Sequence, residues 1–358
     1  MKPTEQLHDL GQSLWLDNIT RTMLDDGTLE RYINELSVTG LTSNPTIFDK
    51  AISAGDAYDE QIAELRERGL DGEQLFFELA LADLLRAAKL FEPEHERTDR
   101  MDGYVSLEVS PLLAYKTDET IQQAADLHGR AADNVFIKIP GTPDGLPAIE
   151  ESIFAGVPIN VTLLFSSDQT IAAAEAYMKG VERRIEAGLD PDVPSVLSIF
   201  ISRWDVAVHD EVPDELKNTL GVAVGKGAYR DWRRLFEADR WKGLADQGAR
   251  LQRLLFASTG TKDPEASDTL YIEAFAAPDT IDTMPDKTLE AFADHGKVGE
   301  PLPADGGDSE QVMQAHRDAG IDTDALALKL QKDGAEAFVK SWTELLDTIK
   351  SESERLAA

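Results

Sequence analysis

Cysteine is absent from the 358 residues of the sequence. Its absence excludes disulfide bonds, zinc–thiolate sites, iron–sulfur clusters and catalysis by a thiol. Long apolar runs are also missing. None approaches the roughly 18 residues that span a bilayer, and the opening stretch, MKPTEQLHDLGQ, lacks the apolar core of a signal peptide. We therefore expect a cytoplasmic protein without a membrane partner.

Basic residues are scarce relative to acidic ones. The chain has 67 Asp and Glu but only 35 Lys and Arg, which gives a formal net charge of −32 at pH 7. A field of this sign repels nucleic acid and anionic lipid surfaces, so neither is an expected partner. The acidity can serve solubility alone, whereas an anionic substrate would require a locally basic pocket.

Features that divide or repeat a chain are missing too. We find no long linker, no internal repeat and no low-complexity tract, so residues 1–358 are expected to form one domain. The composition, 42% hydrophobic and 28% charged, is sufficient for a large core. The first apolar segment, LWLDNITRTMLDDG, contains no G-x-G-x-x-G, which disfavours a dinucleotide-binding sheet.

The sequence does contain short apolar or β-branched runs that alternate with longer segments of helical periodicity. The runs predict eight strands, at 14–19, 38–41, 105–109, 134–139, 159–165, 195–201, 254–258 and 270–276. Eight strands alternating with helices favour an α/β fold of the (β/α)8 type, a TIM barrel, over an open doubly wound sheet.

Helical periodicity covers most of the segments between these runs. It predicts helices at 28–36, 71–91, 117–132, 167–187 and 288–294, and at 206–236 with a break near Gly225. Additional N- and C-terminal helices are expected at 4–13 and 321–358, packed outside the barrel. Residues 92–101 and 296–308 are expected to form polar surface loops.

One predicted strand contains a lysine among apolar neighbours. In DNVFIKIPGTPDG, side chains alternate between two faces, so Phe136 and Lys138 point into the barrel. Val135 and Ile137 then face the helices. Burial disfavours the ammonium form of a lysine, and a neutral amine can attack a ketone to form a Schiff base. A lysine at a strand edge could instead extend to solvent.

Polar side chains from other strands favour the buried alternative. Asp17 is inward in LWLDN, Glu108 in YVSLEVSP, and Asn160 and Thr162 in PINVTLLFS. Catalytic groups in such barrels lie where the strands end, so these side chains are expected to converge. One carboxylate could form a structural ion pair with Lys138, but two carboxylates can also move the protons that Schiff-base chemistry requires.

The last strands offer groups suited to a phosphate. Ser198 is inward in SVLSIFISRWD, Arg203 follows that strand, and Ser258 and Lys262 lie in LLFASTGTKDP. Phosphates in this fold are commonly held after the seventh and eighth strands by backbone N–H, hydroxyl and cationic groups. Arg203 and Lys262 could be ordinary surface cations, but in so acidic a chain two cations at this end favour an anionic substrate.

The chain resembles transaldolase in six segments that occur in this order: LWLDNITR, VTGLTSNPTIF, VSLEVSP, NVFIKIPGTPDGLPAI, GVPINVTLLFS and SIFISRWD. The later ASTGTKDPEASDTLYIEAFAAPDTIDTMP is similar to the form found in actinobacteria and related bacteria. The resemblance covers nearly the whole chain. It implies a barrel enzyme of the pentose phosphate pathway that needs no metal or organic cofactor. The enzyme would transfer a dihydroxyacetone unit from fructose 6-phosphate or sedoheptulose 7-phosphate to glyceraldehyde 3-phosphate or erythrose 4-phosphate.

The resemblance also implies a role for each candidate residue. Lys138 would form the Schiff base. Glu108 and Thr162 would hold and activate a catalytic water, and Asp17 would take and return the proton of the donor's C4 hydroxyl. The expected substrate-binding residues are Asn44 in TSNPT, Asn160 and Ser198 for the donor's hydroxyl groups, and Arg203 and Ser258 for the phosphate.

One position departs from the family pattern. Shorter members carry an arginine two residues after the serine that matches Ser258, whereas Gly260 stands here. We expect Lys262, two residues further on, to supply the phosphate-binding cation instead.

Two other functions stay open. A class I aldolase would cleave fructose 6-phosphate without an acceptor, but the length of the chain and the presence of Glu108 favour transfer. A non-catalytic sugar-phosphate-binding protein is disfavoured because Asp17, Glu108 and Lys138 are all present. Self-association into a homo-oligomer is compatible with either enzyme.

Overall fold

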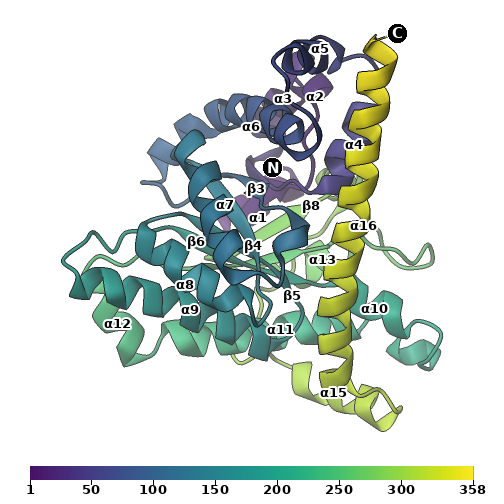
Figure 1. Cartoon of the computed structure of the whole chain (residues 1–358). Helices are drawn as coiled ribbons and strands as arrows, with labels where there is room; N and C mark the ends of the chain where they lie inside the picture. Colours follow the sequence, from purple (N-terminus) through teal and green to yellow (C-terminus); the bar gives the residue numbers. More distant parts are fainter. Residues whose placement is uncertain (358) are drawn as a thin grey trace.

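Eight parallel strands close into a barrel in the computed structural model, which describes residues 1–357 (Figure 1). The strands are β1 (Ser13–Leu16), β2 (Val38–Leu41), β3 (Val105–Glu108), β4 (Val135–Pro140), β5 (Ile159–Leu164), β6 (Ser195–Phe200), β7 (Arg253–Ala257) and β8 (Ile281–Met284). Each strand pairs with the next along the chain, and β8 pairs with β1. The predicted (β/α)8 barrel is confirmed.

Helices fill the connections and surround the barrel (Figure 1). As far as β4 they are α1 (Pro3–Asp9), α2 (Arg21–Asp25), α3 (Thr28–Leu36), α4 (Pro45–Ser53), α5 (Asp59–Glu67), α6 (Gly72–Arg97), the 3-10 turn η1 (Pro111–Leu113) and α7 (Thr117–Arg130). Beyond β4 they are α8 (Gly145–Ala155), α9 (Ser167–Glu186), α10 (Ser202–Val208), η2 (Asp214–Leu216), α11 (Leu220–Phe236), α12 (Asp239–Ala245), α13 (Leu270–Ala274), α14 (Asp286–His295), α15 (Ser309–Asp318) and α16 (Thr323–Ala357).

The prediction of the eighth strand at 270–276 was wrong. This segment contains the short helix α13, and the eighth strand is β8, with the sequence IDTM. Thr283 of β8 points into the barrel, while the Asp282 carboxylate is within 2.9 Å of the Thr259 hydroxyl behind the strand. Two of the four residues of β8 are therefore polar, and a search for apolar runs passes over it.

The predicted helix 206–236 is divided, but not at Gly225. The break lies between α10 and α11, and α11 begins where Asp205 accepts a hydrogen bond of 2.9 Å from the backbone N–H of Leu220. Gly225 lies inside α11, where a Cβ would be only 2.4 Å from the Phe275 ring. The glycine allows a close contact between α11 and the α13 segment rather than ending the helix.

The predicted loop at 92–101 is helical in its first half. α6 continues to Arg97 with Pro93 inside it. A proline removes one backbone donor, and the carbonyl that loses its partner belongs to Lys89, which is exposed and can be solvated. Six connecting helices were not predicted at all: α2, α4, α5, α8, α12 and α15.

The two terminal segments also differ in detail from the prediction. The N-terminal helix α1 ends at Asp9, and Ser13 already belongs to β1. The C-terminal segment forms one helix of 35 residues, α16, drawn in yellow along one side of the molecule from α15 to α5 (Figure 1). Residue 358 lies outside the described part of the chain.

A layer of buried side chains closes the amino-terminal end of the barrel. Arg253 of β7 donates to the Ser13 hydroxyl at 2.6 Å and to the Thr280 carbonyl at 2.7 Å. Above this layer the Phe136 ring stacks on Tyr104, with centroids 4.1 Å apart. The barrel is therefore a filled core, and a substrate can enter only at its carboxyl-terminal end.

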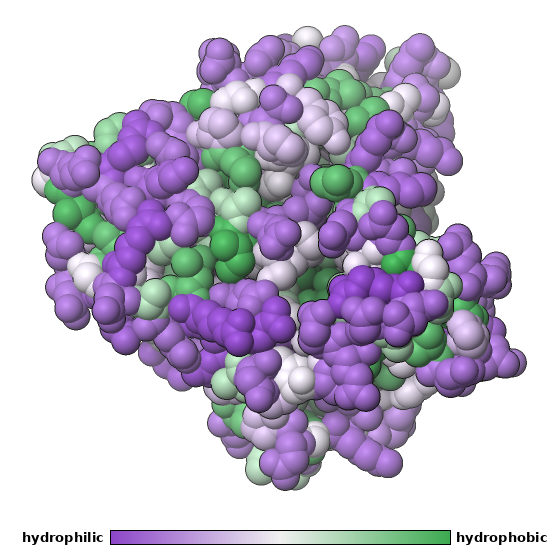
Figure 2. Space-filling model, turned by 90° about the horizontal axis from the view of Figure 1, so that it is seen from below, coloured by the Kyte–Doolittle hydropathy of each residue, from purple (hydrophilic) through white to green (hydrophobic). Residues whose placement is uncertain are grey.

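Polar residues cover most of the outer surface seen in Figure 2, with hydrophobic residues in smaller areas between them. This agrees with a chain that has 67 acidic residues and an extensive apolar core. Within residues 1–357, no helix combines the length and the apolar character needed to cross a bilayer.

Replacing Gly40 of β2 with alanine tests the packing of the barrel interior. A Cβ at this position would lie 2.6 Å from both the Trp15 ring and the Tyr104 carbonyl oxygen. We expect Gly40→Ala to lower the free energy of unfolding by about 3 kcal/mol, measured by urea denaturation. Gly55→Ala is the control, because no atom lies within 4 Å of its Cβ. Equal stability of the two variants would contradict the close packing around Gly40.

Candidate active site

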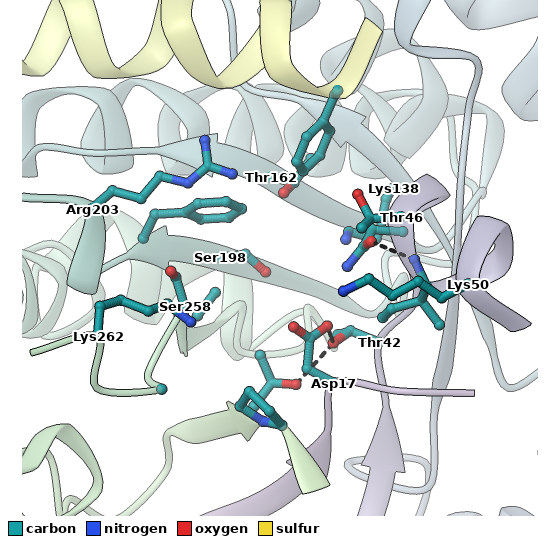
Figure 3. A pocket seen from close by; sticks show the side chains of 18 residues that line it. Asp17, Thr42, Thr46, Lys50, Lys138, Thr162, Ser198, Arg203, Ser258 and Lys262 are labelled. Atoms are coloured by element: carbon teal, nitrogen blue, oxygen red, sulfur yellow. Dashed lines mark hydrogen bonds between the residues drawn. The ribbon is translucent and has the colours of Figure 1, made fainter. Parts of the chain in front are cut away.

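The polar residues predicted to point inward meet in a cavity at the carboxyl-terminal end of the barrel. The cavity has a volume of about 320 Å³. Eight of the predicted site residues line it: Asp17, Asn44, Lys138, Thr162, Ser198, Arg203, Ser258 and Lys262. They come from the ends of β1 and β2, from β4, β5 and β6, from α10 and from the loop after β7, so segments more than 240 residues apart in the sequence contribute to one site (Figure 3).

Lys138 and Glu108 form a buried pair. They occupy paired positions on β4 and β3, and Lys138 Nζ lies 3.6 Å from Glu108 Oε2. Only 7% of the Lys138 side chain and 4% of the Glu108 side chain are exposed. The ammonium also donates a 3.1 Å hydrogen bond to the backbone oxygen of Ser43. The lysine is therefore inside the barrel, and it does not extend to solvent.

Burial raises the pKa of Glu108 to about 7, and Lys138 only partly opposes this effect. Neither carboxylate oxygen has a hydrogen-bond partner among residues 1–357, and the same is true of Thr162 Oγ1. Buried polar atoms without a partner are rare in folded proteins. These three atoms are therefore available to a water molecule or a substrate next to Lys138, and Glu108 can change its protonation state near neutral pH.

Asp17 borders the cavity from the end of β1. It accepts a 2.8 Å hydrogen bond from the Thr42 hydroxyl, which is also 2.8 Å from the Thr283 hydroxyl. Burial raises the pKa of Asp17, although Lys138 and the Thr42 hydroxyl act in the opposite direction. Asp17 is thus held in a fixed orientation and can accept a proton more readily than an exposed aspartate.

The two predicted asparagines occupy different places. Asn44 borders the cavity, and its Oδ1 accepts a 3.1 Å hydrogen bond from the backbone N–H of Ile47 at the start of α4. This leaves its amide N–H groups for a ligand. Asn160 is fully buried, donates to Ser106 Oγ at 3.1 Å and accepts from Ser198 Oγ at 2.7 Å. It therefore fixes the Ser198 hydroxyl that borders the cavity.

Arg203, Ser258 and Lys262 lie on the opposite side of the view from Lys138 in Figure 3. Burial alone lowers the pKa of Arg203, with no carboxylate of residues 1–357 contributing. Ser258 adopts a left-handed backbone conformation, φ 57°, and its hydroxyl is 2.8 Å from the Ser202 hydroxyl. This side of the cavity offers two cations and hydroxyl groups, which suits a phosphate.

Lys262 occupies the space above Gly260. A Cβ built on Gly260 would lie 3.5 Å from Lys262 Nζ. The ammonium therefore stands where a longer side chain at position 260 would begin, which supports the expectation that Lys262 takes the place of the arginine carried there by shorter relatives.

The sequence alone did not identify every residue of the cavity. The additional lining residues are Thr42, Thr46, Ile47, Lys50, Phe200, Ala257, Thr283, Pro285 and Phe338. Thr46 and Lys50 follow the TSNP segment closely and could have been suspected from that proximity. Phe338 lies in α16, and no local pattern connects it with the strands. Within residues 1–357, no group of three or more His, Asp or Glu side chains is arranged to hold a metal ion.

Comparison with known proteins gives the same family along nearly the whole chain. The family described as Transaldolase/Fructose-6-phosphate aldolase matches residues 14–349. A transaldolase of Mycobacterium ulcerans is 42% identical over 97% of this chain and 96% of its own length. A transaldolase of Frankia alni is 41% identical over 99% and 98%, respectively. A transaldolase of Mycolicibacterium smegmatis is 42% identical over 96% and 95%. The chain belongs to the Transaldolase/Fructose-6-phosphate aldolase family.

Proposed function

We propose that the protein is a transaldolase of the pentose phosphate pathway. It transfers a dihydroxyacetone unit from fructose 6-phosphate or sedoheptulose 7-phosphate to glyceraldehyde 3-phosphate or erythrose 4-phosphate. The observation that carries the proposal is the buried Lys138–Glu108 pair, 3.6 Å apart, whose lysine borders a cavity that is also lined by Asp17 and by the cations Arg203 and Lys262. An amine, two proton carriers and a phosphate site are the groups that this reaction requires.

The first step is formation of the Schiff base. The neutral amine of Lys138 attacks C2 of the ketose, and the carbonyl oxygen takes up a proton to give a carbinolamine. This intermediate then loses its C2 hydroxyl as water, which leaves the imine. Glu108 supplies and receives these protons through a water that it holds together with Thr162, because the oxygens of both side chains are buried and otherwise unpartnered.

Asp17 acts in the cleavage step. It takes the proton of the C4 hydroxyl as the C3–C4 bond breaks, and the electron pair of that bond passes into the enamine on Lys138. The aldose phosphate leaves and a second aldose phosphate takes its place. Asp17 then returns the proton to the new hydroxyl as the new bond forms. The raised pKa of this buried carboxylate supports both directions of transfer.

The remaining residues bind and orient the substrate. Asn44 and Ser198 hydrogen-bond the hydroxyl groups of the dihydroxyacetone unit, and Asn160 orients the Ser198 hydroxyl. At the other end of the substrate, Arg203, Ser258 and Lys262 bind the phosphate. The chemistry uses only groups of the chain, so we propose no metal or organic cofactor.

The proposal includes a cytoplasmic location, because phosphorylated sugars are charged and do not cross membranes freely. Nucleic acid is not proposed as a partner of a chain with a net charge of −32. A homo-oligomer stays a prediction.

A plain class I aldolase would use the same Schiff base, so the two functions must be separated by assay. With fructose 6-phosphate as donor, we expect turnover to depend on added erythrose 4-phosphate. Release of free dihydroxyacetone at a rate independent of the acceptor would instead support aldol cleavage.

Reductive trapping tests the role of Lys138. Borohydride added with fructose 6-phosphate should reduce the imine to a stable amine and attach the dihydroxyacetone unit to Lys138, as located by peptide mass spectrometry. Lys138→Met should give no adduct. An adduct on another lysine, such as Lys50 in the same cavity, would overturn the assignment.

The pH dependence of turnover tests the role of Glu108. Below a pH of about 7, Glu108 carries a proton and can no longer act as the proton acceptor. We expect wild-type kcat/KM to fall as the pH decreases through the pKa of Glu108. Glu108→Gln should lower kcat by about 100-fold or more and lose this acid limb. A variant that kept kcat and only raised KM would contradict a proton-transfer role.

Exchange of the phosphate-binding cation tests Lys262. We expect Lys262→Ala to raise KM for fructose 6-phosphate by about 10-fold, as for loss of one charged hydrogen bond. The concentration of dihydroxyacetone needed for borohydride trapping on Lys138 should change much less, because dihydroxyacetone has no phosphate. Adding Gly260→Arg should restore part of the lost affinity. Lys297→Ala is the control, because it removes the same charge from an exposed residue outside the cavity. Equal weakening of both ligands by Lys262→Ala would argue against phosphate binding.

A further inference from the structure

Arg203 is held in the cavity by aromatic rings and by α16. Its guanidinium carbon lies 5.3 Å from the centroid of Phe200 and 5.9 Å from that of Phe338. Both distances fall within the range of a cation–π interaction. No carboxylate of residues 1–357 forms an ion pair with Arg203, so the orientation of its side chain depends on packing against these rings. One of the two rings, Phe338, comes from the C-terminal helix, which crosses above Arg203 in Figure 3.

Three residues of α16 form one stripe that faces the strand ends. Gln331, Gly334 and Phe338 are spaced by three and four residues, so they lie on the same side of the helix. The Gln331 amide donates 3.0 Å hydrogen bonds to the backbone oxygens of Gly141 and Leu163. These two carbonyls follow β4 and lie in β5, so the stripe is fixed to the strands that carry Lys138 and Thr162.

Polar contacts also fix α16 to the other side of the cavity. The Thr46 hydroxyl donates to Ser341 at 2.8 Å, and the Thr348 hydroxyl donates to Asp49 at 2.6 Å. Thr46 and Asp49 belong to α4, the helix that begins after Asn44. The helix is therefore attached at several points on both sides of the site, and its position relative to the strands is well defined.

Gly334 is a position in the stripe where the helix comes close to Arg203. Glycine lowers the stability of a helix interior, so its presence inside a helix of 35 residues calls for a reason. A Cβ at Gly334 would lie 3.0 Å from Leu163 Cδ2 and 3.2 Å from Arg203 Nη1. Both neighbours would therefore have to shift by a few tenths of an ångström: the Leu163 methyl group and the guanidinium of Arg203.

We propose that the Gln331–Gly334–Phe338 stripe of α16 is a positioning element for the phosphate-binding Arg203. Gly334 leaves the space that the guanidinium of Arg203 occupies, and Phe338 supplies one of the rings that orient this group. Gln331 fixes the position of the helix relative to β4 and β5. The inference rests on the proposed function, because it takes the phosphate of the substrate as the ligand of Arg203. It assigns a part in substrate selection to the helix most distant in sequence from the catalytic strands.

The first test replaces Gly334 with alanine. We expect Gly334→Ala to raise KM for fructose 6-phosphate and the inhibition constant of inorganic phosphate by about 5-fold each, because the guanidinium is displaced by a few tenths of an ångström. The concentration of dihydroxyacetone needed for borohydride trapping on Lys138 should change less than either of these constants. Gly129→Ala is the matched control, since Gly129 also lies in a helix but has no atom within 4 Å of its Cβ. Both substitutions favour helix, so thermal stability should not explain a difference between them.

A second set of variants keeps the test decisive if Gly334→Ala fails to fold. Phe338→Leu keeps an apolar wall but removes the ring near Arg203, and it should weaken inhibition by inorganic phosphate. Phe338→Tyr keeps the ring and should retain phosphate affinity. Unchanged phosphate inhibition in both Gly334→Ala and Phe338→Leu would overturn the role of α16, as would equal losses with phosphate and with dihydroxyacetone. A wild-type protein that does not turn over fructose 6-phosphate would contradict the proposed function instead.

Discussion

The site depends on a lysine and a glutamate kept 3.6 Å apart in the interior of the barrel. Removing two such groups from water is costly, and a buried ion pair is often no more stable than an apolar pair of similar volume. The same burial raises the pKa of Glu108 to about 7 and brings the charged and neutral forms close in free energy. The pair therefore contributes little to the stability of the fold, but it is well suited to moving a proton onto and off an amine.

The two ends of the barrel have different roles: residues at the amino-terminal end stabilise the fold, and residues at the carboxyl-terminal end carry the chemistry. Its amino-terminal end is closed by Arg253 and a stacked aromatic layer, whose polar atoms are satisfied by backbone and side-chain partners. Its carboxyl-terminal end contains the unpartnered oxygens of Glu108 and Thr162. Since each strand contributes residues to both ends, the rigid lower layers hold the reactive side chains in place without taking part in the reaction.

The charge of the site is opposite to that of the chain as a whole. The net charge is −32, yet the cavity is bordered by Lys50, Lys138, Arg203 and Lys262, with Asp17 as its one acidic lining residue. An anionic substrate is repelled by the overall field and attracted only close to the cavity. Local cations that come from α4, β4, α10 and the loop after β7 therefore determine binding, and α16 contributes by packing against one of them.

The sequence by itself determined the barrel and most of its inward-facing polar residues. The side chains of a buried strand alternate between two faces, so local spacing was enough to direct Asp17, Glu108, Lys138 and Thr162 into one interior. Only the tertiary structure identified β8, whose polar residues hide it from a search for apolar runs, and the place of Phe338 and Gly334 beside Arg203. These features depend on contacts between segments far apart in the chain, and the periodicity of a single segment contains no information about which distant segment it will meet.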